Sequence, residues 1–272
     1  MAYRPLFVLL GALLIAAAPR YDRNKLPYQA TWGAYTVRVE SVPGRPRPTQ
    51  KLTITDRQGR VAKEIRAVLI TNVSFPKLLR GDGADLHVAA FSGGAHSDFA
   101  DYLFTQKGGL RNILVFFGRN DGIGQIKDLN GDGIPELIAG NDALAYFDDL
   151  PFALSPHLTM VLGWNGQRYV DVTSQYPAIA RENARRYRQQ LGRGGDIDSQ
   201  KVRAAALGYY ANATLAGEGP SARSWIRGHE SPETFRWLEA HEAAMRKAIA
   251  ASRTKISVSQ SPVLTLLGVR QL

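Results

Sequence analysis

The segment that decides the fold reads Asp128-Leu-Asn-Gly-Asp-Gly-Ile-Pro-Glu-Leu-Ile-Ala-Gly-Asn-Asp142. Oxygen-bearing side chains stand at its first, third, fifth and ninth positions, a glycine at the sixth permits a sharp turn, and the seventh offers a backbone carbonyl. Calcium takes about six to eight oxygen ligands, so a loop with an oxygen at every second residue can wrap around it. We therefore expect one calcium ion, held by Asp128, Asn130, Asp132, the carbonyl of Ile134, and Glu136.

The residues that follow this loop exclude an EF-hand. An EF-hand loop closes with an acid at its twelfth position and continues as a helix, whereas position twelve here is Ala139, in a run of apolar strand formers. A plain turn between two strands is the alternative interpretation. Metal binding is favoured over that turn because three carboxylates within nine residues would repel one another without a cation.

A degenerate copy of the loop lies upstream, in the sequence Leu78-Leu-Arg-Gly-Asp-Gly-Ala-Asp85. It aligns with the intact loop if one residue is deleted, but its first and third positions are Leu78 and Arg80, so we expect no calcium there. By their numbers, Asp82 and Asp132 lie about 50 residues apart, which is close to the length of a four-stranded repeat unit.

The nine-residue loop that opens into a strand resembles the calcium loop of FG-GAP repeats, which are found in integrin-α β-propellers and in many bacterial VCBS-type surface proteins. Three further strings resemble a group of exported bacterial FG-GAP/VCBS-like proteins of unknown function: residues 92–96, 145–147 and 164–173. The resemblance covers residues 51–173 and implies a calcium-stabilised β fold. Many members carry cysteines after the Gly-Gly-Ala-His string, where this chain has Ser97 and Asp98.

Residues 28–173 are predicted to form a mainly β domain. Alternating apolar and polar residues indicate strands, and Asn165-Gly166 is typical of a tight hairpin turn. The expected strands cover residues 35–42, 52–55, 61–70, 86–91, 113–117, 136–139 and 159–164. A small or incomplete β-propeller-like domain is the first interpretation. An open sheet or a β-sandwich is the alternative, because one intact and one degenerate loop cannot make a ring of six or seven blades.

The pattern changes after Ser174, and residues 174–256 are expected to be helical, with a tail over 257–272. Helices are predicted at residues 177–191, 199–216 and 232–252, with Ser231 as the N-cap of the last one. Five arginines make the first of these helices strongly basic: Arg181, Arg185, Arg186, Arg188 and Arg193. Because no nucleic-acid-binding signature accompanies them, a solvated face is expected and no nucleic-acid partner.

The composition excludes several functional classes. The chain has 272 residues and no cysteine, so there is no disulfide framework, thiolate nucleophile, Cys-ligated metal or lipidated Cys. With 44% hydrophobic and 21% charged residues it is an ordinary globular chain. Its formal net charge of +10 is compatible with an anionic partner.

The N-terminus indicates export. One charged residue, Arg4, precedes a 13-residue apolar run over residues 6–18, which is shorter than the ~20 residues that span a bilayer. We expect residues 1–18 to be a signal peptide or an uncleaved anchor. The protein is thus predicted to be periplasmic or secreted, and to touch a membrane only through this segment.

The sequence lacks most of the residue patterns that are typical of enzymes. Ser92, His96 and Asp98 fall close together, but no Gly-x-Ser-x-Gly elbow surrounds the serine. His229 and His241 are each followed by Glu, without the second His of a zinc protease motif. We therefore expect a non-enzymatic, calcium-stabilised binding or structural module of the cell envelope, with an unknown envelope or extracellular ligand. The alternative is an envelope hydrolase that acts on an anionic polymer through residues 92–101.

Overall fold

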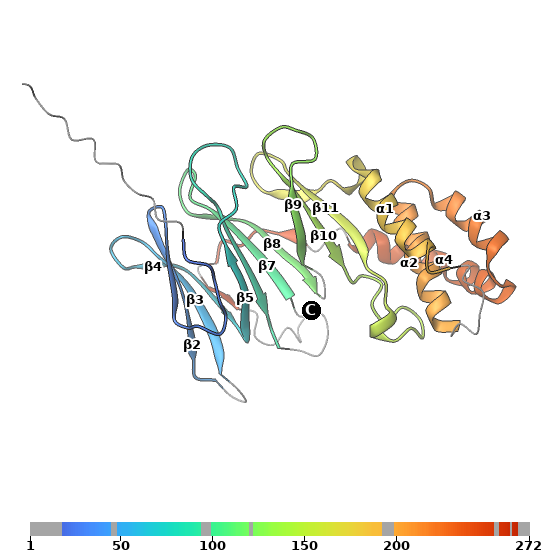
Figure 1. Ribbon diagram of the computed structural model, residues 1–272, viewed down its shortest axis with the longest axis horizontal. Helices are drawn as coiled ribbons and strands as arrows, with labels where there is room; N and C mark the ends of the chain where they lie inside the picture. The colour runs from blue at the N-terminus through green and yellow to red at the C-terminus, as the bar shows by residue number, and fades with distance from the viewer. Residues whose placement is uncertain are drawn as a thin grey trace, which may run out of the picture.

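The computed structural model describes residues 18–44, 48–93, 99–119, 122–191, 199–252, 256–261 and 263–265. Within these residues the chain is mainly β, with three sheets followed by four α-helices. This confirms the predicted mainly β region and the helical region after it. The sheets succeed one another along the long axis of the molecule, and the helices lie beyond the third sheet (Figure 1). The predicted leader, residues 1–18, lies outside the described residues except for Ala18.

The first sheet is an antiparallel meander of consecutive strands. They are β1 (Tyr28–Trp32), β2 (Tyr35–Val42), β3 (Thr49–Thr55) and β4 (Val61–Ala67). Along β1, buried and exposed residues alternate strictly, as a strand with one buried face requires. A short strand near the C-terminus, β14 (Val263–Thr265), pairs parallel to β4 and covers the edge of this sheet.

The second and third sheets repeat the same meander. The second consists of β5 (Leu69–Ser74), β6 (Leu86–Phe91), β7 (Phe99–Thr105) and β8 (Arg111–Arg119), with β13 (Ile256–Ser257) on its β8 edge. The third consists of β9 (Ile123–Lys127), β10 (Glu136–Asn141), β11 (Leu158–Trp164) and β12 (Tyr169–Asp171). Each sheet is therefore built around four strands that follow one another in the sequence.

The single strand expected over residues 61–70 is wrong, because this stretch forms two strands in different sheets. β4 ends at Ala67 in the first sheet and β5 begins at Leu69 in the second. An alternating pattern indicates an extended, half-buried chain, but it carries no information on which neighbour the strand pairs with. The described strands form three open sheets and close into neither a barrel nor a ring.

The C-terminal helices include the three that the sequence predicts, α1 (Pro177–Arg188), α2 (Ser199–Leu215) and α4 (Pro232–Ser252). The hydroxyl of Ser231 caps α4 as expected, because it accepts the backbone N–H of Thr234 at 3.2 Å. The fourth, α3 (Gly219–His229), is not expected from the sequence because its two glycines and its proline are poor helix formers. None of the helices in the described part of the chain is both long and apolar enough to cross a membrane.

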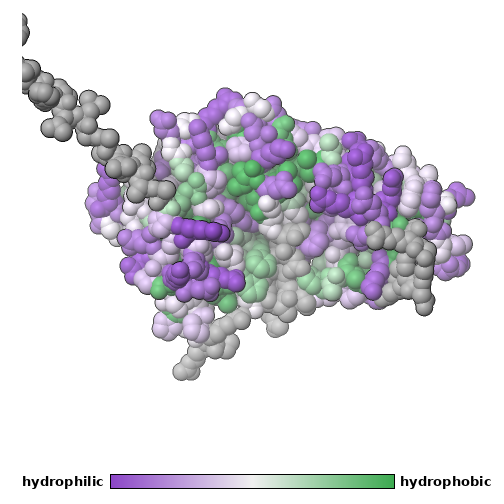
Figure 2. Space-filling model, in the orientation of Figure 1, coloured by the Kyte–Doolittle hydropathy of each residue, from purple (hydrophilic) through white to green (hydrophobic). Residues whose placement is uncertain are grey.

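The second sheet is buried on both faces, which explains its nearly continuous apolar strands. Tyr102 and Phe104 of β7 are packed against the first sheet, whereas Leu103 between them packs against the third. Leu137 of β10 belongs to the same layer as Leu103, while Leu158 of β11 packs with the helices. The third sheet thus lies between the second sheet and the helical region. Hydrophilic side chains gather over α1 on the outer face of that region (Figure 2).

Candidate functional site

The predicted calcium loop connects β9 to β10, and the degenerate loop connects β5 to β6. Each loop therefore joins the first strand to the second in its own sheet. Gly131 and Gly133 have positive φ angles of 77° and 81°, and Gly81 and Gly83 of the degenerate loop have φ angles of 96° and 85°. Because side chains other than glycine rarely adopt such angles, the Gly-Asp-Gly string sets the same turn in both places.

The acid that closes each loop makes the same hydrogen bond. Oε2 of Glu136 accepts the backbone N–H of Leu129 at 2.8 Å, and Oδ2 of Asp85 accepts that of Leu79 at 2.9 Å. Both carboxylates are almost fully buried. The two loops are thus equivalent in position and in their closing contact, as the alignment of the two strings predicts.

The other predicted calcium ligands hold the loop through their side-chain oxygens. The two oxygens of Asp128 accept the backbone N–H groups of Gly131 and Gly133 at 2.8 and 2.9 Å. Oδ1 of Asn130 accepts the N–H of Asp132 at 2.9 Å, and Oδ1 of Asp132 that of Ile134 at 2.7 Å. Backbone N–H donors, that of Gly133 first, lower the pKa of Asp128 from its ordinary value.

The carboxamide of Asn130 stands between two of the acids. Its Nδ2 donates to Oδ2 of Asp132 at 3.1 Å and lies 3.4 Å from Oε1 of Glu136. Among the described residues, no three His, Asp or Glu side chains converge as a metal-binding group. The oxygen donors of the loop fit a hard cation in kind. A cation between Asp132 and Glu136 would replace the N–H contacts of Asn130, which would then present its oxygen.

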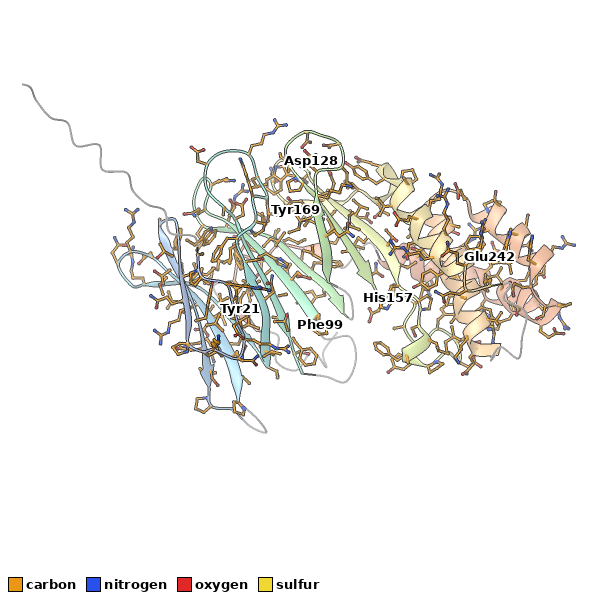
Figure 3. The ribbon with its side chains drawn as sticks, viewed as in Figure 1. Tyr21, Phe99, Asp128, His157, Tyr169 and Glu242 are labelled. Atoms are coloured by element: carbon orange, nitrogen blue, oxygen red, sulfur yellow. The ribbon has the colours of Figure 1, made fainter. Side chains whose placement is uncertain are left out.

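Aromatic side chains fix the loop at one end of the third sheet. Asp128 and Tyr169 lie at that end, whereas His157 lies toward the opposite end (Figure 3). The hydroxyl of Tyr169 lies 3.1 Å from the carbonyl of Pro135 and 3.2 Å from that of Leu78, and so joins the two loops. Burial, followed by the hydrogen bond to Glu136, raises the pKa of Tyr176 to about 12.

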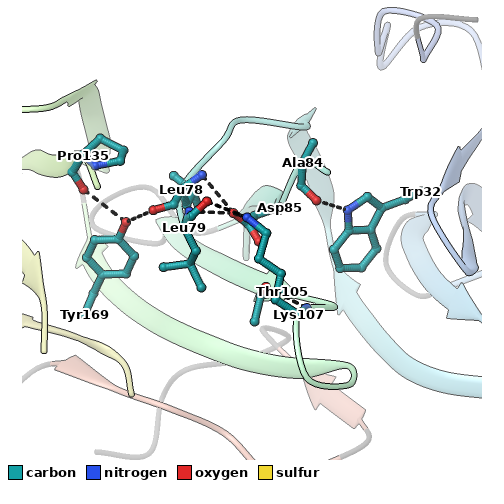
Figure 4. A network of polar contacts seen from close by, with 9 residues as sticks. All are labelled: Trp32, Leu78, Leu79, Ala84, Asp85, Thr105, Lys107, Pro135 and Tyr169. Atoms are coloured by element: carbon teal, nitrogen blue, oxygen red, sulfur yellow. Dashed lines mark hydrogen bonds and ion pairs between the residues drawn. The ribbon is translucent and has the colours of Figure 1, made fainter. Parts of the chain in front are cut away.

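Two cations stand at the loops. The guanidinium of Arg80 donates from Nε to the carbonyl of Asp132 at 3.0 Å, so the third position of the degenerate loop contacts the intact loop. Nζ of Lys107, from the β7–β8 turn, donates to the carbonyl of Leu79 and lies 3.4 Å from Oδ2 of Asp85 (Figure 4). In the degenerate loop, the ammonium of Lys107 therefore places a positive charge beside the closing acid, Asp85.

Part of the loop over residues 92–101 lies outside the described residues, including His96 and Asp98. Asp101 is buried in β7, where its Oδ1 lies 2.5 Å from Nε2 of His87 and its Oδ2 accepts the N–H of Ile123 at 3.1 Å. This carboxylate thus ties the second sheet to the start of the third. No motif in the sequence points to His87, which lies in β6, the strand that pairs with β7 in the meander.

A pocket of about 480 Å³ lies between the third sheet and α1, and sequence reasoning missed it. Its sheet wall includes β9, whose residues are mostly exposed and show no apolar period, so that no strand was expected there. Its other wall includes α1, interpreted from the sequence only as a solvated face. The polar side chains of the pocket are Gln125, Lys127, His157, Thr159, Glu182, Asn183, Arg186 and Tyr187.

A buried network of amides holds α1 and α2 against this sheet. Asn212 of α2 is fully buried, and its Oδ1 accepts the N–H of Thr159 at 2.9 Å while its Nδ2 donates to the carbonyl of His157 at 3.0 Å. Nδ2 of Asn183 donates to Oγ1 of Thr159 at 3.0 Å and lies 3.2 Å from Oδ1 of Asn212. The contacts with Thr159 and Asn212 therefore fix the orientation of the Asn183 side chain at the pocket.

Comparison of the chain with protein-family models, with curated protein sequences and with solved structures found no match in any of the three.

Proposed function

We propose that this protein is a non-enzymatic, calcium-stabilised binding or structural module of the cell envelope, of the FG-GAP/VCBS-like type. The observation that carries the proposal is the loop over residues 128–136. Its oxygen-bearing side chains recur at every second position, its closing acid Glu136 is buried, and it joins the first two strands of a sheet. These are features by which a chain holds a calcium ion at a strand end.

In this proposal the three sheets are blade-like repeats in an open, propeller-like row. Support comes from the equivalent places of the intact loop and the degenerate loop in successive four-stranded meanders. Their closing acids, Glu136 and Asp85, make the same backbone hydrogen bond. A row of three such units buries its sheet faces against one another and against the helices, without closing into a ring.

The proposed ligands are Asp128, Asn130, Asp132, the carbonyl of Ile134, and Glu136. Bound calcium would supply the positive charge that neutralises three acids crowded into nine residues. The chain's own contribution is to hold these groups together. The buried Glu136 ties the loop to the strand that follows, and Tyr169 fixes Pro135 next to the degenerate loop.

Export to the periplasm or the exterior is the cellular setting that we propose. The apolar run over residues 6–18 after a single charged residue supports it. The partner is then an envelope or extracellular ligand rather than a nucleic acid. The net charge of +10 favours an anionic one.

Thermal melts in millimolar calcium and in a chelator test the proposal. Calcium at ~100 times its Kd should stabilise the protein by roughly 2.7 kcal/mol, because it binds only the folded state. Asp132→Ala should abolish this response. Asp82→Ala, the same change in the Gly-Asp-Gly string of the degenerate loop, should keep it. Equal melting temperatures of the unmodified protein in calcium and in chelator, or an unchanged response in Asp132→Ala, would contradict the proposal.

A further inference from the structure

We propose that the pocket between the third sheet and α1 binds a small anion that also carries hydroxyl groups, such as a sugar acid or a sugar phosphate. The inference names a ligand class for the binding module proposed above and rests on that proposed function. It does not depend on calcium binding by the loop over residues 128–136. The volume of about 480 Å³ falls within the range of about 300–1,000 Å³ that is common for small-molecule sites.

The pocket holds polar atoms that the protein does not use elsewhere. Within the described residues, the ammonium of Lys127, the carboxamide of Gln125 and Oδ1 of Asn183 form no hydrogen bond or ion pair. Together they offer a cation, a group that both donates and accepts, and an acceptor. A ligand that matches all three carries an anionic group, a hydrogen-bond donor for Asn183 and a donor or acceptor for Gln125. Hydroxyl groups supply both of the last two functions.

Asn183 is a fixed acceptor rather than a mobile one. Both contacts of its Nδ2, to Thr159 at 3.0 Å and to Asn212 at 3.2 Å, lie on the side of the buried amide network. Since Asn212 is fully buried, this arrangement does not have to be formed when a ligand arrives. Such pre-organisation lowers the entropic cost of binding a hydroxyl group.

The charge of the pocket comes mainly from Lys127. Nη2 of Arg186 lies 2.6 Å from Oε1 of Glu182, so this pair is neutral as a whole. Lys127 has no carboxylate partner in the described part of the chain and leaves the lining with a surplus positive charge. A neutral sugar would leave that charge unmatched, whereas a simple anion would leave the two amides unmatched.

Glycines open the sheet side of the pocket to the backbone. Gly124 and Gly140 line it without side chains, which allows a ligand to approach the strands closely. Leu129 and Ile138 add an apolar surface for the C–H face of a sugar ring. The pocket therefore combines one positive charge that is unpaired among the described residues, two amides and an apolar surface, a few placed polar groups of the kind that orient a bound small molecule.

Isothermal titration calorimetry with four probes tests this assignment: glucuronate, glucose 6-phosphate, glucose and acetate. We expect saturable binding of glucuronate or glucose 6-phosphate, and the preferred one of the two identifies the anionic group. Glucose and acetate should bind at least tenfold more weakly. No binding of either sugar anion up to about 10 mM, or equal binding of glucose, would overturn the proposal.

Variants locate the binding. Lys127→Gln should weaken binding of the sugar anion at least tenfold, whereas Lys201→Gln, at an exposed lysine of α2 outside the pocket, should leave it unchanged. Gln125→Ala, at an exposed position of β9, should weaken the sugar anion several-fold and leave acetate unchanged. Equal affinities of Lys127→Gln and the unmodified protein would overturn the proposal.

Each titration is done in calcium and in chelator. The absence of a calcium effect on melting, with sugar-anion binding retained, would refute the proposed calcium loop and leave the pocket assignment standing. A calcium response without any sugar-anion binding would refute the pocket assignment and leave the proposed calcium loop standing.

Discussion

The ammonium of Lys107 lies 3.4 Å from Oδ2 of Asp85, a fully buried carboxylate at the end of the loop that joins β5 to β6. Asp85 closes the degenerate loop as Glu136 closes the intact one, and each accepts the N–H of the leucine at the second position. Within one chain, two equivalent acids thus have different surroundings. Asp85 has a lysine beside it. Glu136 instead closes a loop with further oxygen-bearing side chains, those of Asp128, Asn130 and Asp132.

Lys107→Met should destabilise the protein by about 2–4 kcal/mol, because it leaves the charge of Asp85 buried without its cation. Urea unfolding followed by tryptophan fluorescence measures the change in the free energy of unfolding. Lys201→Met, the same substitution at an exposed lysine, should alter it by less than about 0.5 kcal/mol. If Lys107→Met were as stable as the unmodified protein, Asp85 would not depend on the ammonium.

Gly122→Ala should destabilise the protein by about 1–3 kcal/mol, the usual range for forcing an extra methyl group into a packed site. A Cβ at this position would lie 2.6 Å from Oδ2 of Asp101, the oxygen that accepts the N–H of Ile123. Two residues further along, the Cβ of Gly124→Ala would have its nearest neighbour at 3.7 Å, so this variant is the control. Thermal melts of the pair should show a lower melting temperature for Gly122→Ala; equal values would mean that Asp101 can move without cost.

Asn212→Leu should lower the free energy of unfolding by about 2–4 kcal/mol, because the N–H of Thr159 and the carbonyl of His157 lose their buried partner. The helices should then be held less firmly to the third sheet. Limited proteolysis should cleave the helical region of the variant sooner than that of the unmodified protein. Equal cleavage rates and equal stability would show that the amide network does not hold the two parts together.

The stability of the protein should fall between about pH 10 and pH 12, partly through Tyr21. Burial, the largest cause, raises its pKa from 10.0 to about 12, and its hydroxyl donates to the carbonyl of Ile70 at 2.9 Å. In this interval the folded state keeps a proton that the unfolded state has lost, so the free energy of unfolding decreases as pH rises. Tyr21→Phe should show a shallower decrease in melting temperature over this range. A slope equal to that of the unmodified protein would contradict the role of Tyr21.

The fold class and several elements follow from the sequence because their signals are local. The alternation over residues 35–42 predicts β2, and Ser231 marks the start of α4. The assignment of Val61–Ala67 and Leu69–Ser74 to different sheets could not be predicted, since it depends on which faces pack together. β9 was missed for a related reason, because an exposed edge strand has no apolar period.

The two candidate sites also differ in how far the sequence alone predicts them. The oxygen-bearing residues of the loop over 128–136 are contiguous, so their pattern is visible in the sequence. The pocket brings together Lys127 of β9, Asn183 of α1 and His157 from the segment before β11, and the pairing of His87 with Asp101 joins two strands. When a site is assembled from residues that are distant in the sequence, those residues form no motif of fixed spacing by which a single sequence could reveal it.

The return of the C-terminal residues to the first two sheets has a consequence for the order of folding. β14 pairs Leu264 with Ile65, and Nζ of Lys63 donates to the carbonyl of Ser261 at 2.8 Å. During synthesis, β4 pairs with β3 along one edge, but its other edge has no partner strand until residues 263–265 have left the ribosome. An open strand edge is a place where two nascent chains can join by mistake. Pairing of residues 263–265 with β4 is thus the step at which this edge of the first sheet becomes protected against such contacts.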